Sequence, residues 1–136
     1  MTELPSKPSE LIRLALKDLR LAETNPRYKV DMAVWHCPDS NDNTCRVCLA
    51  GAVIAGLGAN PDEPISPYGF DPQTVQRLCA LNRFRQGRVE HALNAMRIPT
   101  KPAVPIDRQV TPYDRSPSGF KRDMELLIEE LERAGL

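Results

Sequence analysis

The sequence predicts a mainly α-helical domain: four to five helices packed around a buried central helix at about residues 45 to 57, with a short β segment near residues 28 to 35. Apolar residues recur at helical spacing in several segments. The segment after Cys45 is apolar nearly all round, as in a helix buried on most sides. Thirteen prolines divide the chain into separate pieces. A length of 136 residues with 41% hydrophobic content indicates one domain, residues 1 to 136.

The first segments predict one helix and one strand. Residues 6 to 23 form a helix in this interpretation, because apolar residues repeat at i, i+3, i+4 and i+7 from Ile12 to Leu19. Residues 28 to 35 alternate with a period of two, which is typical of a strand. No second strand stands out in the chain. The strand is therefore expected to pair with its symmetry mate in a second copy, or to remain an extended segment.

The predicted central helix runs from about Cys45 to Leu57. Asn43 or Thr44 would cap its start, and Gly58 would end it. Its many alanines and glycines would let neighbouring helices approach closely. We expect this helix to be the most buried element of the fold.

Two further helices are expected in the next part of the chain. Asp71 is a suitable cap, and the proline after it suits a first helical turn, so a helix is predicted from there to about Arg85. Gly87 interrupts the pattern. A second amphipathic helix then follows from Val89 to Met96.

The last segments predict a connector and a C-terminal helix. Residues 98 to 117 hold five prolines and few large apolar groups, which indicates a long extended connector. Residues 118 to 134 repeat apolar residues on one face, and Gly135 would end this helix.

Charge and hydropathy favour some settings over others. Eighteen basic and eighteen acidic residues give a net charge of zero, whereas nucleic-acid binders usually carry a positive excess. No apolar run approaches the length of a membrane span, so no membrane partner is expected. The first residues do not read as a secretory signal, so a cytoplasmic location with reduced thiols is expected. The four cysteines are then free thiols or metal ligands: Cys37, Cys45, Cys48 and Cys79.

The pair Cys45 and Cys48 is the first candidate site. At a helix start both sulfurs would lie on nearly the same face, and the helix dipole would favour thiolates. A zinc site would use Cys37, Cys45 and Cys48, with His36 or Cys79 as the fourth ligand. Against it stands the adjacency of His36 and Cys37, which makes joint binding to one ion awkward.

Two other uses of the pair are open. One of the cysteines could be a nucleophile with His36 or His91 as base, although no catalytic residues were identified. A thioredoxin-type redox pair is disfavoured, because no βαβ unit precedes it. Close packing of buried thiols explains the segment best, so no cofactor is expected.

Basic residues gather in one region of the chain. Phe84 lies between two of them, and aromatics among cations suit the stacking of bases, so this region is a candidate nucleic-acid or nucleotide site. The favoured alternative is a solvated helix surface that pairs with the acidic C-terminal helix. The five arginines are Arg77, Arg83, Arg85, Arg88 and Arg97.

Three aromatic residues are candidates for an interaction surface. Trp35 stands before a polar loop, and Tyr68 and Phe70 lie in a proline-rich loop. Aromatic side chains anchor interfaces when they are exposed. The predicted interaction surface therefore comprises Trp35, Tyr68, Phe70, Arg83, Arg85 and Arg88.

Three segments carry a resemblance to a known group of proteins: "VDMAVWH", "CRVCLAGAVIAG" and "ALNRFRQGRVEHAL". With them the chain resembles small uncharacterised proteins encoded by tailed bacteriophages and prophages. The likeness spans about residues 28 to 96 and the final helix. It implies an accessory role in a bacterial cytoplasm during infection and brings no established activity.

The expected function is that of a non-enzymatic interaction protein, a phage accessory factor that binds a host protein or a defence component. The expected partner is a host bacterial protein, with a second copy of the chain or a nucleic acid as alternatives. A cysteine- or zinc-dependent enzyme or ligand-binding protein that uses Cys45 and Cys48 is the alternative from another class. Nucleic-acid or nucleotide binding through the Arg77 to Arg97 region is the third.

Overall fold

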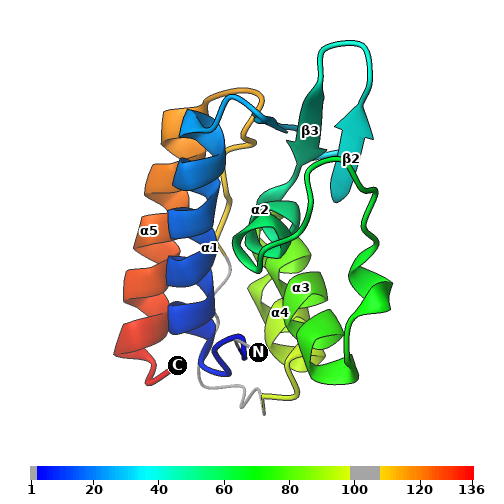
Figure 1. Ribbon diagram of the computed structural model, residues 1–136. Coiled ribbons are helices and arrows are strands. Elements are labelled where there is room, and N and C mark those ends of the chain that lie inside the picture. The colour runs from blue at the N-terminus through cyan, green and yellow to red at the C-terminus, as the bar shows by residue number, and fades with distance from the viewer. Residues whose placement is uncertain (1–2, 99–107) are drawn as a thin grey trace.

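The computed structural model describes residues 3 to 98 and 108 to 136. This part of the chain is mainly helical, with five α-helices and one small mixed sheet (Figure 1). The helices are α1 (Pro8–Thr24), α2 (Leu49–Gly56), α3 (Pro72–Phe84), α4 (Val89–Ala95) and α5 (Pro117–Arg133). The strands are β1 (Tyr28–Val30), β2 (His36–Asp39) and β3 (Thr44–Val47), and a 3-10 turn η1 (Pro67–Gly69) precedes α3.

Four of the predicted helices are present close to their expected positions. The caps explain several of their boundaries. Asp71 accepts a hydrogen bond from the backbone N–H of Thr74 at the start of α3, and Ser116 caps α5 in the same way through Gly119. Pro72 and Pro117 occupy the first helical turn, where no N–H is needed.

The sheet is larger than the sequence predicted. Its strand order is β1-β3-β2, with β3 parallel to β1 and antiparallel to β2. Tyr28 lies opposite Cys45, and His36 lies opposite Val47. The strand expected at residues 28 to 35 extends only to Val30, and it pairs within the chain.

The helix expected from Cys45 to Leu57 is wrong in its first turn. Residues Thr44 to Val47 form β3, and α2 begins at Leu49. Burial in β3 alternates, with Cys45 and Val47 buried and the other two residues half-buried. This period of two in a short segment is concealed by the apolar run that follows it.

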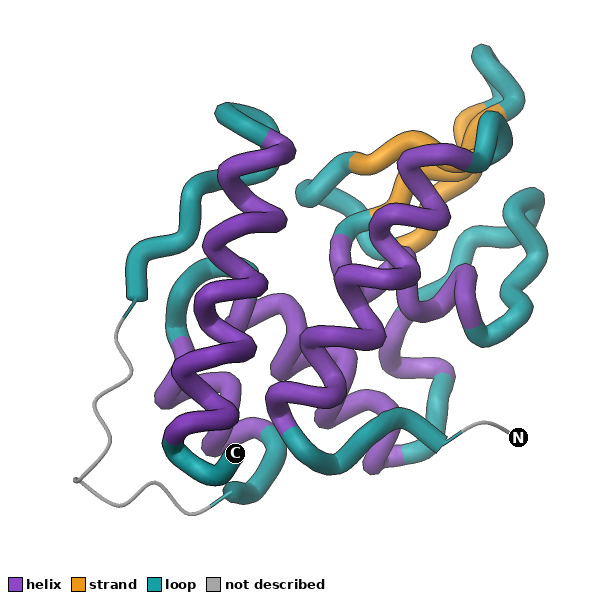
Figure 2. Tube along the Cα trace, turned by 90° about the vertical axis from the view of Figure 1, so that its left-hand side faces the viewer, coloured by secondary structure: helices purple, strands orange, loops and turns teal. Residues whose placement is uncertain are grey.

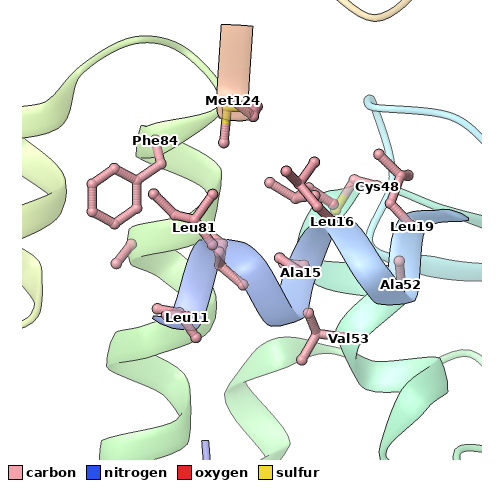
Figure 3. Close-up of a cluster of buried hydrophobic side chains, with 14 of the residues drawn as sticks. Leu11, Ala15, Leu16, Leu19, Cys48, Ala52, Val53, Leu81, Phe84 and Met124 are labelled. Atoms are coloured by element: carbon pink, nitrogen blue, oxygen red, sulfur yellow. The ribbon is translucent and has the colours of Figure 1, made fainter. Parts of the chain in front are cut away.

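Helix α1 contacts α2, α3, α5 and β1. Helices α1 and α5 lie side by side along one side of the molecule, and the view from the left shows the strands gathered at one end (Figures 1 and 2). Between α1, α2, α3 and α5 lies a cluster of buried side chains that includes Leu16, Val53, Leu81 and Met124 (Figure 3).

The acidic side of α5 pairs with partners other than those expected. The predicted pairing was with the arginines of residues 77 to 97. Instead, Glu132 and Glu125 of α5 form ion pairs with Arg13 and Arg20 of α1, and Glu130 pairs with Arg108. The arrangement follows from α1, rather than α3 or α4, being the neighbour of α5.

Part of the predicted connector at residues 98 to 117 lies outside the described residues. The described piece before α5 contains no helix or strand, and Val110 and Tyr113 in it pack against the core. Within the described ranges, no helix has the length and apolar character needed to cross a membrane.

Candidate functional site

The predicted cysteine site is divided between two faces of the sheet and the start of α2. Cys37 is exposed on β2, whereas Cys45 on β3 is fully buried. Cys48 caps α2, and its sulfur accepts a hydrogen bond from the N–H of Gly51 at 3.4 Å. Figure 3 shows Cys48 among apolar side chains near Leu16 and Leu19. The expectation that both sulfurs of the pair share one helix face is therefore wrong, because only Cys48 is at the helix.

The chemistry of the two buried thiols differs from that of a ligand or nucleophile. Burial raises the pKa of the Cys45 thiol to about 11 and also raises that of Cys48. Thiols of this kind stay protonated at neutral pH, whereas metal binding and attack need the thiolate. Across residues 3 to 98 and 108 to 136, no three histidine, cysteine or acidic residues are grouped to hold a metal ion. The set His36, Cys37, Cys45 and Cys48 does not fit a zinc ion.

His36 is a buried histidine of the sheet. It is 2% exposed, its Nδ1 lies 2.9 Å from the carbonyl oxygen of Glu63, and its ring meets Tyr28 edge-on at 6.0 Å. Its Nε2 is buried without a hydrogen-bond partner. Burial lowers the pKa of His36, so the ring is neutral at pH 7. His91, the other candidate base, is exposed on α4.

In the predicted basic site, the residue expected to stack with a nucleobase is Phe84, and the structure buries it. Phe84 is fully buried in the core and presents no ring to solvent. Arg83 and Arg88 are exposed, and Arg85 is half-buried with its Nε donating to Asn82 at 2.6 Å. Arg77 is half-buried and donates to the carbonyl oxygen of Leu4 at 2.7 Å.

The three aromatic residues of the predicted interaction surface differ in their exposure to solvent. Tyr68 is 72% exposed on η1, while Trp35 and Phe70 are half-buried against the core. Among the described residues, the other large apolar side chain that is strongly exposed is Leu21 on α1, at 57%. Of the predicted aromatics, Tyr68 alone is free to anchor a partner.

A pocket of about 420 Å³ lies between the end of α1, the end of α2 and the start of β1. Its volume is within the range of about 300 to 1,000 Å³ that is usual for ligand pockets. The wall is mostly apolar, and the exposed Leu21 belongs to it. The lining residues are Asp18, Leu21, Ala22, Thr24, Asn25, Tyr28, Ala52, Ala55 and Gly56.

Asp18 is the unusual group of this pocket. Its side chain is on α1, and the residue is 8% exposed. Among the described residues it has no hydrogen bond and no ion pair, whereas buried carboxylates are normally paired. Burial raises its pKa to about 6, and the nearby charge of Lys17 opposes part of that rise.

Gly56 makes room for this carboxylate. A Cβ built on Gly56 would lie 2.6 and 2.8 Å from the two oxygens of Asp18, which is too close for an unstrained contact. The last turn of α2 therefore approaches the carboxylate closely only because residue 56 has no side chain. The oxygens of Asp18 and the end of α2 thus form one continuous wall of the pocket.

The sequence reasoning missed Asp18, although a signal for it exists. The buried face of α1 includes Leu11, Ala15 and Ala22, and Asp18 falls at helical spacing between the last two. A carboxylate within a buried stripe is either paired or part of a site.

The chain matches no protein-family model, and neither the comparison with curated proteins nor that with solved structures finds a match.

Proposed function

We propose that this chain is a non-enzymatic interaction protein and that it binds a partner protein at the pocket between α1, α2 and β1. The observation that carries the proposal is the combination of a pocket of about 420 Å³ with the exposed Leu21 in its wall. Concave sites with apolar walls and a few polar groups are where proteins bind other molecules. An exposed apolar side chain beside such a site is a suitable anchor for a partner.

The scaffold of the pocket supports a binding role. In this proposal the other helices pack around α2, whose residues from Leu49 to Ile54 are all buried. Helix α2 contacts α1, α3, β2 and β3, which holds two walls of the pocket in fixed positions. A rigid wall loses little entropy when a partner binds, and this favours affinity.

The partner class follows from the resemblance to small phage proteins. It is a protein of the bacterial host, either an enzyme that the phage redirects or a component of a defence system. In this proposal the chain acts in the bacterial cytoplasm as a phage accessory factor. The buried, protonated thiols of Cys45 and Cys48 support binding rather than thiol chemistry.

The test compares two exposed anchors on different elements, Leu21 and Tyr68. The wild-type chain, Leu21→Gln and Tyr68→Gln are each immobilised, exposed to a bacterial host lysate, and the bound protein is identified and purified. Its affinity for the three chains is then measured by calorimetry. We expect Leu21→Gln to weaken binding by at least about tenfold, a loss of 1.4 kcal/mol. Both substitutions are at exposed positions, so both variants should fold.

Other outcomes separate the parts of the proposal. If Tyr68→Gln weakens binding and Leu21→Gln does not, the partner binds at η1 and the pocket is not the interface. If the purified partner binds all three chains equally, neither anchor serves. A chain that binds no protein and no second copy of itself would contradict the interaction function altogether.

A further inference from the structure

We propose that the pocket receives a basic side chain of the partner protein, whose cationic group pairs with the carboxylate of Asp18. This inference rests on the proposed function, because it names the chemistry of the group that the partner inserts. The first support is Asp18 itself, which lines the pocket and is 8% exposed. Its carboxylate has no hydrogen bond and no ion pair among the described residues. An ionised carboxylate of this kind is stabilised when a cation or a hydrogen-bond donor reaches it, and a basic side chain supplies both.

The second support is the direction of the two helices. The pocket is lined by Leu21, Ala22 and Thr24 at the end of α1 and by Ala55 and Gly56 at the end of α2. Both are C-terminal ends, each with a partial negative charge of roughly half an elementary charge. Cations are stabilised at such ends, and anions are not. The last turns of α1 and α2 contain no basic residue, so no cation within these turns offsets the negative ends of the helices.

The third support is the remaining wall. Tyr28 of β1 lines the pocket, and an aromatic ring attracts a cation placed over its face. The charged neighbour that acts on Asp18 from its own helix is Lys17, which is exposed and forms no ion pair with Asp18. Helix α2 has no titratable side chain. The pocket therefore holds one carboxylate and two helix C-termini in a mostly apolar wall that is open to solvent. Arg27, which acts on Tyr28 from the chain before β1, is paired with Asp62. Such a wall suits the long aliphatic stem and charged end of lysine or arginine.

The test uses NMR titration of the isotopically labelled full chain with three small probes. The first is an arginine-centred tripeptide capped at both ends, and the second has citrulline, the uncharged isostere, in place of arginine. The third is 1,4-diaminobutane, a free diamine. Signals from the pocket backbone, such as those of Ala22 and Gly56, report the binding site.

We expect the arginine peptide to shift the pocket signals and to bind at least about tenfold more tightly than the citrulline peptide at pH 7.5. Asp18→Asn should abolish that preference. Glu10→Gln removes the same charge from an exposed position of the same helix and should retain it. Binding of the arginine peptide should weaken as the pH falls through about 6, because Asp18 is then protonated, and Asp18→Asn should lose this dependence.

Each contrary result is informative. Equal binding of arginine and citrulline peptides, or no shift of the pocket signals by either, overturns the assignment of a cationic occupant. Tighter binding of the diamine than of the arginine peptide assigns the pocket to a free amine and overturns the partner side chain. If the host partner still requires Leu21 in either case, the proposed function stands and this inference alone fails. If the arginine peptide binds but the partner is indifferent to Leu21, the proposed function fails instead.

Discussion

At the scale of single residues, Asp18 has a cost in stability, and in our proposal it binds the cationic group of a partner. Its carboxylate is buried without a partner in the described structure, and its pKa is raised to about 6 from 3.8. The folded chain therefore binds the proton of Asp18 more strongly than the unfolded chain does. Between about pH 4 and pH 6, the contribution of Asp18 to the free energy of unfolding falls as the pH rises. Above pH 6 the full cost of burying its charge is present.

Asp18→Asn should accordingly stabilise the chain at neutral pH. A shift of this size corresponds to about 3 kcal/mol, and the amide of asparagine is itself polar and retains part of the burial cost. We expect the free energy of unfolding at pH 7.5 to rise by about 1 to 2 kcal/mol, and the gain to vanish near pH 4. Urea unfolding of the wild type and the variant over a series of pH values measures both quantities.

The pH dependence of unfolding must be compared between the wild type and Asp18→Asn, because His36 also contributes to the wild-type dependence. Burial lowers the pKa of His36, so the folded chain resists its protonation. Its contribution to stability is lost as the pH falls below 6.5, which is opposite in sign to the effect of Asp18. Glu10→Gln, on the same helix as Asp18, is the control. A gain from Asp18→Asn that is equal at pH 4 and pH 7.5 would contradict an ionised, unpaired carboxylate.

At the scale of elements, α2 depends on a close approach to the loop before β2. A Cβ on Gly51 would overlap the carbonyl oxygen of Trp35, a backbone atom that cannot move aside alone. The same carbonyl accepts a hydrogen bond from the N–H of Cys48 at 3.4 Å, so the loop is held against the start of the helix. A glycine is therefore needed at position 51 because there is no room for a side chain, and not because of its backbone angles.

Gly51→Ala should destabilise the chain by about 3 kcal/mol or more, because the helix or the loop must shift to accommodate one methyl group. Gly69→Ala is the matched control, since nothing lies within 4 Å of the position of its added Cβ. Thermal unfolding followed by circular dichroism compares the two variants. Equal melting temperatures for Gly51→Ala and Gly69→Ala would show that the contact between α2 and the loop is looser than described.

Four helices and the position of β1 could be predicted from the sequence, whereas the start of α2 and the other two strands could not. Apolar spacing predicted α1 and α5 to within about two residues at each end, because these long amphipathic helices repeat the pattern over several turns. Strands β2 and β3 have four residues each, and β2 contains Pro38, which counts against a strand. Such short strands are stabilised by their pairing, and pairing is a tertiary contact that local pattern does not contain.

The candidate site was harder to predict than the fold. The sequence drew attention to the cysteines, whereas the pocket is formed by the ends of two helices and one strand that meet only after folding. Asp18 is one of three acids on α1, and its place in the pocket depends on Gly56, which is 38 residues further along the chain. Tyr68 is exposed, and its role in an interface is still a prediction.

At the scale of the whole molecule, polar contacts join the first and last helices. Glu23 near the end of α1 accepts hydrogen bonds from the hydroxyl of Tyr113 at 2.5 Å and from Nζ of Lys121 at 2.9 Å. The side chains of Glu23 and Lys121 are 20% and 23% exposed, so water screens this pair only in part. Burial and the bond to Glu23 raise the pKa of Tyr113, which donates at all physiological pH values. By contrast, the ion pair of Arg20 with Glu125 is half-exposed.

Glu23→Gln should reduce the free energy of unfolding by about 1 kcal/mol, because it removes the charge from two charge-assisted hydrogen bonds. Arg20→Gln neutralises a similar pair in a more exposed position and should cost about 0.5 kcal/mol or less. Urea unfolding at low salt measures both losses. At 1 M salt the loss from Arg20→Gln should shrink more than the loss from Glu23→Gln, so the difference between the variants should widen. A larger loss from Arg20→Gln would contradict the ranking by exposure.

The pairing of α1 with α5 also has a consequence for the chain during synthesis. Lys121 is 98 positions after Glu23, so the ribosome must add nearly a hundred residues before the two can meet. At about 5 to 20 residues per second, that interval is on the order of 5 to 20 seconds. During this interval, the apolar face of α1 that packs against α5 in the complete fold has no α5 to pack against. A nascent chain arrested before α5 emerges would therefore expose the apolar side of α1 that packs against α5, a surface of the kind that chaperones bind.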